Sequence, residues 1–376
     1  MERDITTLNS YEPDYAVHPG EYLEEVLEAR EIKKREFAER VGLSVKAVSQ
    51  IINGKALYSP EAALRFERVL GINAAIWSTM AKSYELFKAR EEEERRLQAA
   101  EVAAWVRRFP TADLKRLGIL PDTRRADQLA EALFRFFGVS GIEAWEEYSA
   151  GKAALYRQSA KHPVSREAVE VWLTLAEREA EGIETDQFDK KRFTEALSEI
   201  RSFTLLPPEE FFPRMVELLA RTGVALVVVP ELKGTRISGA ARWLSPGRAL
   251  ISLSLRYKSN DQFWFSFFHE AAHILLHGKR IFIDQKDGSD DGEDDTKEAE
   301  ANEFAGNLLI PRAEYRRFIA AGSFYEGDIR SFAEKISLHP GIVVGRLQHD
   351  GLLDYKFQNG LKEGFEYAYP DDEESN

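Results

Sequence analysis

The spacing of apolar residues changes once along the chain, and this change limits the fold more than any other feature. Over residues 18–204, apolar side chains recur mostly every three or four positions, which is typical of amphipathic helices. Three short segments rich in β-branched residues follow: Gly223 to Pro230, Gly234 to Trp243 and Ala249 to Leu255. They predict a small three-stranded sheet. Because helical spacing resumes at Asp261, we expect an α+β fold that is mainly α.

The same pattern divides the chain into four regions. Residues 1–82 predict a small helical bundle, and residues 83–205 predict a helical connecting domain that starts with a long charged helix. Residues 206–320 hold the sheet segments and two strong helical patterns, Phe263 to His277 and Lys297 to Leu309. Residues 321–376 predict a C-terminal helical segment and a frayed tail. No internal repeat is evident.

Composition excludes several classes of protein. The chain has no cysteine, which rules out a disulfide scaffold, a thiol nucleophile and a cysteine zinc site. No stretch approaches the roughly 20 apolar residues of a membrane helix, and the first ten residues do not resemble a secretory signal. We therefore expect a cytoplasmic protein without a membrane span, in which any metal ion is held by His, Asp or Glu.

Charge is unevenly distributed. The net charge of −13 argues against non-specific nucleic-acid binding by the whole chain. Residues 33–68, however, hold eight basic residues and only four acids, whereas residues 284–300 hold nine acids and two lysines. A local basic patch is therefore compatible with an acidic protein.

The segment His269-Glu270-Ala271-Ala272-His273 is an H-E-x-x-H motif within a predicted helix. On a helix, positions i and i+4 stand on one face, so His269 and His273 can direct their imidazoles at one metal ion. Glu270 is then close enough to address a water molecule at the ion without being a ligand, which suits a general base. The alternative is a chance motif in an ordinary surface helix.

A hydrolytic zinc site needs a third protein ligand and an open position for water. The next predicted helix offers Glu298 for this role, and Asn302 one turn later can orient a ligand histidine by a hydrogen bond. His277 lies about 12 Å of helix rise from His269, too far to bind the same ion, so we interpret it as a supporting residue. The sequence thus predicts a Zn²⁺ site made by His269, His273 and Glu298.

The acidic segment between the two helices permits a competing interpretation. Asp287, Ser289, Asp291, Gly292 and Glu298 fall on positions 1, 3, 5, 6 and 12 of a calcium-binding EF-hand loop. Position 8 of such loops is normally apolar but is Asp294 here, and a solvated linker explains the composition more simply. Calcium and zinc would compete for the same Glu298 carboxylate, so only one of the two interpretations can hold.

Residues 35–52 predict two helices joined by a tight turn. Gly42 permits the turn, Ser44 is a natural N-cap, and Ala38 and Val48 can pack between the helices. The second helix would present outward side chains to DNA bases, with flanking residues at the phosphates. The candidate DNA-contacting residues are Lys34, Ser44, Lys46, Ala47, Ser49, Gln50, Asn53 and Lys55. The alternative is an ordinary three-helix bundle with a solvated face.

Longer motifs resemble two known families. The segments His18 to Leu23, Gly42 to Val45, Ile52 to Lys55 and Ser59 to Arg65 resemble the HigA-type antitoxin branch of the XRE helix-turn-helix family. The segments Ser238 to Trp243, His269 to His277, Glu298 to Pro311 and His339 to Gln348 resemble ImmA/IrrE metallopeptidases and their long fused members.

The resemblance implies a zincin-like domain, with His269, His273 and Glu298 as zinc ligands and Glu270 as the base. It also implies a regulator that binds a double-stranded DNA operator and, through two-fold recognition, a homodimer. The partner would be a protein substrate or a cognate toxin. The alternative is a non-enzymatic antitoxin that represses its operon and sequesters a toxin, with a structural or sensory metal site.

Overall fold

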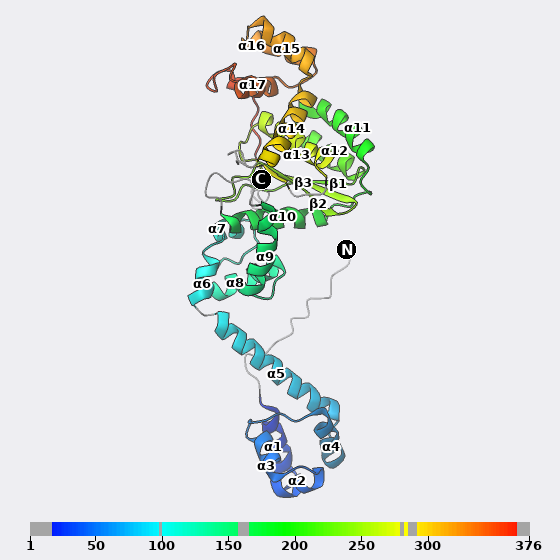
Figure 1. Cartoon of the computed structure of the whole chain (residues 1–376). Coiled ribbons are helices and arrows are strands. Elements are labelled where there is room, and N and C mark those ends of the chain that lie inside the picture. The colour runs from blue at the N-terminus through cyan, green and yellow to red at the C-terminus, as the bar shows by residue number, and fades with distance from the viewer. Residues whose placement is uncertain (1–16, 98–99, 157–164, 279–281, 285–291, 367–376) are drawn as a thin grey trace. The chain divides into compact units, whose positions relative to one another are not determined.

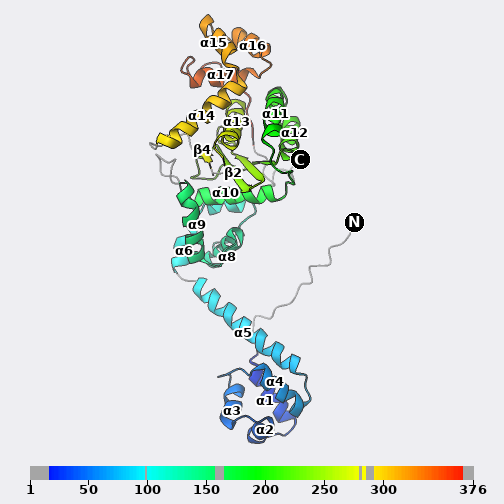
Figure 2. The same cartoon turned by 45° about the vertical axis from the view of Figure 1, so that its right-hand side comes forward.

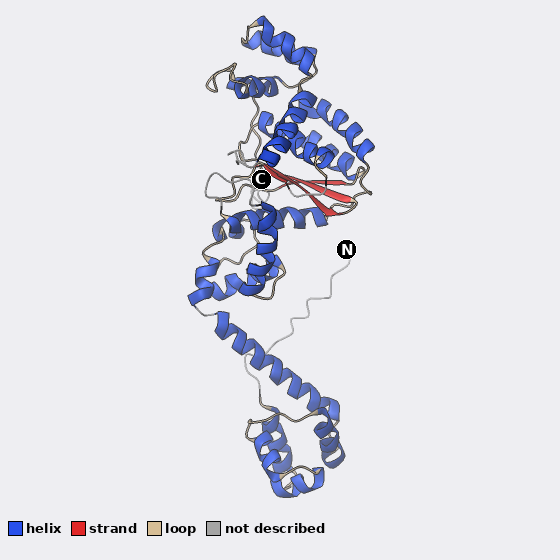
Figure 3. Cartoon of the chain, in the orientation of Figure 1, coloured by secondary structure: helices blue, strands red, loops and turns tan. Residues whose placement is uncertain are grey.

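The computed structural model describes residues 17–97, 100–156, 165–278, 282–284 and 292–366. The chain divides into two compact units, an N-terminal unit of residues 1–100 and a C-terminal unit of residues 101–376. Figure 1 shows the elements of both units, and Figure 3 shows one small sheet among many helices. Among the helices that the structure describes, none is both long and apolar enough to cross a bilayer.

The N-terminal unit consists of helices around one apolar core. Its elements are α1 (Pro19–Ala29), α2 (Lys34–Val41), α3 (Val45–Ile52), α4 (Pro60–Leu70) and α5 (Ala74–Leu97). Phe37, Phe66 and Trp77 are fully buried and their rings contact one another, with centroids 5.3 to 5.6 Å apart for Phe37–Phe66 and Phe66–Trp77. The domain boundary predicted at residue 82 therefore lies inside α5, whose first turns belong to this core.

Helices α2 and α3 form the predicted helix-turn-helix. Gly42 ends α2 with a left-handed φ of 66°, a conformation that glycine adopts at no steric cost. The Ser44 hydroxyl accepts a hydrogen bond of 3.0 Å from the Ala47 amide and so caps α3. Ala38 and Val48 are fully buried between neighbouring helices.

The C-terminal unit starts with a helical region. Its elements are α6 (Ala100–Val106), α7 (Thr111–Arg116), α8 (Ala126–Phe137), α9 (Ile142–Tyr156) and α10 (Arg166–Glu181). Trp105, Phe109 and Trp145 pack edge to face near the centre of α6–α9. Helix α10 is buried along most of its length.

A four-stranded sheet follows α11 (Lys190–Ile200), η1 (Arg201–Leu205) and α12 (Pro208–Ala220). The strands are β1 (Val224–Val228), β2 (Gly239–Ser245), β3 (Arg248–Leu253) and β4 (Phe282–Asp284), in the order β1-β3-β2-β4. Strand β3 pairs parallel with β1 and antiparallel with β2. The sequence predicts the first three strands. It does not predict β4, which pairs antiparallel with Gly239 to Ala241, because three residues are too short a segment for periodicity to detect.

Two long helices complete the main core. Helix α13 (Asn260–Leu276) packs on β2 and β3, and α14 (Gly292–Leu309) packs beside α13. Helix α10 covers the opposite face of the sheet, as Figure 1 and Figure 2 show. The sheet is therefore a layer between α10 and α13, and α13 is buried from both the sheet and the α14 side.

The calcium interpretation fails on the same elements. Asp287, Ser289 and Asp291 lie outside the described residues, but α14 starts at Gly292 and includes Glu298. Positions 6 to 12 of the supposed loop are therefore helical. An EF-hand loop needs a sharp turn at the glycine of position 6 and the backbone carbonyl of position 7 as a ligand, which a regular helix at these positions does not provide. The acidic composition of residues 284–300 suggested a loop, but acidic residues are also common in the first turn of a helix, and α14 starts within this segment.

The C-terminal helices repeat a local pattern of the helix-turn-helix, which corrects the expectation that no repeat exists. They are α15 (Arg312–Ala321), α16 (Glu326–Lys335) and α17 (Pro340–His349), followed by η2 (Asn359–Leu361). At a constant offset of 295 positions, six residues within 35–52 recur. They are Arg35, Phe37, Ala38, Glu39, Leu43 and Val48, which recur as Arg330, Phe332, Ala333, Glu334, Leu338 and Val343.

The turn geometry recurs as well. Ser337 has a left-handed φ of 51° where the first copy has Gly42, and His339 caps α17 where Ser44 caps α3. The surroundings differ, because α17 packs against α13 and most of its residues are buried. Only the first copy therefore leaves its second helix open to a partner.

Candidate metal centre and nucleic-acid interface

Helix α13 brings two imidazoles to one point. His269 and His273 are one turn apart on the face of α13 toward α14, and their Nε2 atoms are 3.0 Å apart. Both side chains are buried, with 2% and 0% of their surfaces exposed. The helix is regular here because Ala271 and Ala272 between them are small and good helix formers.

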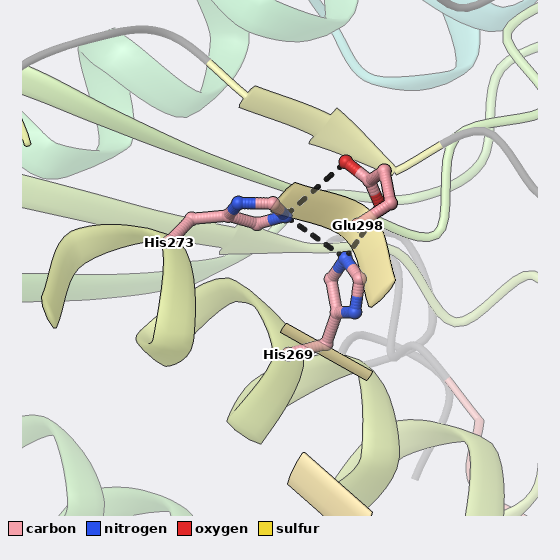
Figure 4. Close-up of side chains that lie close together, drawn as sticks. All are labelled: His269, His273 and Glu298. Atoms are coloured by element: carbon pink, nitrogen blue, oxygen red, sulfur yellow. Dashed lines mark hydrogen bonds and ion pairs between the residues drawn. The ribbon is translucent and has the colours of Figure 1, made fainter. Parts of the chain in front are cut away.

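Helix α14 adds a carboxylate at the same point. Glu298 Oε2 lies 3.1 Å from His269 Nε2, and Glu298 Oε1 lies 3.4 Å from His273 Nε2. Figure 4 shows the two rings and the carboxylate pointing toward one another. The Glu298 side chain is 38% exposed, so the cluster is open to solvent on the α14 side.

The donor set fits a zinc ion. The three ligand atoms all lie within 4.8 Å of one another, and the separations above are 3.0 to 3.4 Å. Ligand atoms about 2.05 Å from a tetrahedral zinc would be about 3.3 Å apart. Two nitrogens and one oxygen from these side chains are a donor set that can hold a zinc ion and leave a fourth position for water.

The pKa shifts of His273 and Glu298 favour the protonation states that bind a metal ion. Burial lowers the pKa of His273 to about 4, despite the opposing effect of the hydrogen bond to Glu298. Burial alone raises the pKa of Glu298, but its hydrogen bonds with His269 and His273 outweigh burial and lower it to about 2. At neutral pH His273 is therefore neutral and Glu298 ionised, which are the forms that bind a cation.

With a metal ion bound in place of the imidazole–Glu298 hydrogen bonds, outer hydrogen bonds would define the tautomers of both imidazoles. His269 Nδ1 is 3.0 Å from Asn302 Oδ1, so Nδ1 donates and Nε2 keeps its lone pair toward the cluster. His273 Nδ1 is 2.9 Å from His277 Nδ1, and His277 Nε2 is 3.0 Å from Glu300 Oε2. One assignment satisfies this chain: His277 donates to Glu300 and accepts from His273, whose Nε2 lone pair again faces the cluster.

Sequence reasoning missed Glu300. It named Asn302 and His277 as supporting residues, and the structure places both against ligand candidates. Glu300 lies 23 residues from His277, across the loop between α13 and α14, so no local spacing links the two. A carboxylate partner for a histidine that supports a ligand is nevertheless a common arrangement in metal sites.

Glu270 lies within the same helix and is fully buried. Its carboxylate points toward β2, where it lies against the backbone of Gly239. Glu270 is next to His269 in the sequence and is not one of the three residues whose ligand atoms converge.

The candidate DNA-contacting residues lie on or around α3, and they differ in exposure and in whether their side chains already have partners within the protein. Within the described residues, the side chains of Lys46, Gln50 and Lys55 are exposed and form no hydrogen bond or ion pair. Ala47 and Ser49 are half-buried. These residues leave one face of α3 open.

The other three candidates have partners inside the unit. The Asn53 amide donates to the Ser49 carbonyl at 2.7 Å, and the Ser44 hydroxyl caps α3. Lys34 is paired with Glu24 at 2.5 Å, so phosphate contact by Lys34 would have to compete with this ion pair. The exposed candidates without such a partner are therefore Lys46, Gln50 and Lys55.

Comparisons with known proteins match both regions. Residues 226–345 match the family described as IrrE N-terminal-like domain (Peptidase_M78), and residues 23–77 match the helix-turn-helix family. The chain is 27% identical over 73 residues to the uncharacterized HTH-type transcriptional regulator YddM of Escherichia coli strain K12, which is 19% of this chain and 78% of that protein.

Two solved structures are similar to part of the chain. One is an addiction module antidote protein of the HigA family from Coxiella burnetii, with 23% identity over 22% of this chain and 89% of that one, at a TM-score of 0.20. The other is a hypothetical protein from E. coli, with 25% identity over 23% of this chain and 95% of that one, also at 0.20. From the two family matches, the conclusion is that this chain is a DNA-binding helix-turn-helix regulator fused to an IrrE-like domain of a peptidase family.

Proposed function

We propose that this protein is a regulator of toxin–antitoxin type whose C-terminal unit is a zinc-dependent endopeptidase acting on a protein. The observation that supports this most is the convergence of His269, His273 and Glu298 beside the buried Glu270. Zinc would be held by the two imidazoles and the Glu298 carboxylate. A zinc ion in such a site supplies Lewis acidity toward a peptide carbonyl and toward water.

The chain's own residues have separate roles in peptide hydrolysis. Glu270 takes a proton from the attacking water as the new C–O bond forms, and it passes that proton to the amine when the C–N bond breaks. Asn302, and the pair His277 and Glu300, hold the two ligand imidazoles in the tautomer that presents Nε2.

The regulatory role depends on the N-terminal unit. We propose that α3 enters the major groove of an operator, with Lys46, Ser49 and Gln50 at base edges and Lys55 and Asn53 near phosphates. A homodimer on a two-fold operator, in the cytoplasm, is part of this proposal. The partner of the protein is a peptidase substrate or a cognate toxin.

Two variants test the peptidase assignment. Glu298→Ala removes a ligand and should lower zinc from about one ion per chain toward zero, as measured by mass spectrometry on protein purified without added metal. Glu270→Gln should keep the ion and lose cleavage, because the amide cannot accept the proton. Glu303→Ala, an exposed acid on the same α14, is the matched control and should change neither.

Cleavage can be measured in cells, where the substrate does not have to be chosen beforehand. New protein N-termini are compared between cells that express the wild type and cells that express Glu270→Gln. Termini specific to the wild type support the endopeptidase. Identical termini, or equal zinc in wild type and Glu298→Ala, contradict it and favour a non-enzymatic antitoxin.

A further inference from the structure

Strand β2 starts with a glycine that is in contact with the proposed base. A methyl group built at position 239 would lie 2.8 Å from Cγ and from Oε1 of Glu270, and 3.1 Å from its Cδ. These are the three nearest atoms, and all belong to Glu270. Contacts this short are repulsive, since non-bonded carbon atoms prefer separations of about 3.5 to 4.0 Å. A side chain at this position would therefore occupy the space that the carboxylate now fills.

The backbone does not explain the glycine. Gly239 is not among the residues with a positive φ, so its conformation is open to any amino acid. It pairs with Leu253 on one side and Asp284 on the other, as an ordinary strand residue does. Glycine inside a strand is unfavourable, and its presence commonly marks a site of close approach. Here the group that approaches is the Glu270 carboxylate.

The Glu270 carboxylate is enclosed by the protein and cannot turn into solvent. Glu270 is 0% exposed, and α13 packs directly on β2. Ala241 shares the face of β2 with Gly239, and Ala271 next to Glu270 is fully buried in the same core as Ala241. A methyl group at position 239 would therefore displace either the carboxylate or the helix that carries it.

We propose that Gly239 is a positioning residue whose missing side chain keeps the Glu270 carboxylate in its working position. This inference rests on the proposed endopeptidase function. It adds that the sheet, and not α13 alone, sets where the base lies. The three atoms nearest to a methyl group at position 239 all belong to Glu270, so the base meets that group before His269, His273 or Glu298 does.

Gly239→Ala should therefore separate cleavage from metal binding. We expect zinc content equal to that of the wild type and a loss of cleavage on the order of 100-fold, since misplacing a catalytic group by about 1 Å costs this much. The matched control is Gly247→Ala, at the β2–β3 turn. The three atoms nearest to its methyl group belong to the flexible, exposed side chain of Gln187, so zinc content and cleavage should stay unchanged.

A stability cycle tests the contact without any substrate. The full-length wild type, Gly239→Ala, Glu270→Ala and the double variant are melted as purified, with zinc measured in each. If the methyl group clashes with the carboxylate, Gly239→Ala should lower the Tm by about 4 °C, and by much less when Glu270 is already alanine. A purely structural need for glycine in β2 would lower the Tm equally in both backgrounds.

The outcomes separate this inference from the proposed function. Equal Tm losses in both backgrounds, or full cleavage by Gly239→Ala, overturn the positioning role and leave the endopeptidase standing. If the wild type and Glu270→Gln yield the same protein termini, the endopeptidase fails, and the Tm cycle still decides whether Gly239 and Glu270 are coupled. Loss of zinc in Gly239→Ala also overturns the inference, because the contact would then hold the ligands as well.

Discussion

At the scale of single residues, the centre depends on protons held by groups that do not touch the proposed ion. With an ion bound, Asn302 would accept from His269, and His277 would accept from His273 while donating to Glu300. Each bond leaves an Nε2 lone pair directed at the cluster. The affinity of the site is therefore expected to depend on residues outside the ligand set.

Glu300→Ala should weaken zinc binding by about tenfold, because His277 loses the acceptor that fixes its tautomer and so the tautomer of His273. Competition with a fluorescent chelator measures this affinity. Glu303→Ala on the same helix is the control. Equal affinities of Glu300→Ala and the wild type would show that the His277–Glu300 contact does not act on the ligand.

Acid should destabilise the metal-free protein in a defined pH window. The pKa of His273 is about 4 in the folded protein against an ordinary 6.5. Between pH 6.5 and 4, His273 is therefore protonated in the unfolded chain but stays neutral in the folded one. This contribution, roughly 3 kcal/mol, is complete above pH 6.5 and lost as the pH falls to 4. The lowered pKa of Glu298 extends the loss from pH 4.5 to 2.

Urea unfolding of chelator-treated protein at pH 7, 5.5 and 4 measures this effect. His273→Gln cannot gain the proton in either state, so its free energy of unfolding should fall less between pH 7 and 4 than that of the wild type. Parallel curves for the two proteins would show that His273 titrates normally in the fold.

At the scale of elements, two similar helix pairs have different surroundings. Helix α3 leaves Lys46 and Gln50 exposed, whereas α17 is packed against α13. The same local pattern therefore serves one surface helix and one core helix, and only α3 is available to enter a DNA groove.

Replacing Lys46, Ser49 and Gln50 together by Ala should abolish operator-specific binding in a gel-shift assay, since about 1 to 3 kcal/mol is lost for each base contact. The fold should survive, because the core residues of α3 are Val48, Ile51 and Ile52. Lys82→Ala, an exposed lysine on α5, is the control. Unchanged affinity of the triple variant would mean that α3 does not read the operator.

At the scale of the whole molecule, the two units have separate cores. The aromatic core around Trp77 lies in the N-terminal unit, and the proposed metal site lies in the core of the C-terminal unit. A ligand stabilises only the folding unit that binds it. Free zinc at roughly 100 times its Kd contributes about 2.7 kcal/mol to that unit.

Calorimetry should therefore show two unfolding transitions, of which chelation of zinc lowers the Tm of one only. Glu298→Ala provides the control, because its transitions should not respond to the chelator. A single transition that shifts as a whole would show that the two units unfold together.

The sequence predicted what depends on local geometry. Helical spacing and turn residues locate α2, α3 and α13 within a few positions, because capping and amphipathic patterns act within a few residues. The i, i+4 spacing alone implies that His269 and His273 share a face. The family matches confirm both domain types, and the ligand roles stay predictions. Strand β4 and the start of α14 were missed because short strands and acidic first turns carry weak local signals.

What the sequence by itself determined is the set of helices and the residue types able to hold a metal ion without cysteine. Only the tertiary structure decided that Glu298 faces both imidazoles, that Glu300 supports His277, and that α17 is buried. It also decided that Gly239 lies against Glu270. The physical reason is that these relations come from the packing of α13 on β2, α14 and α17. Contacts between residues tens to hundreds of positions apart depend on the fit of whole surfaces, which no local spacing records.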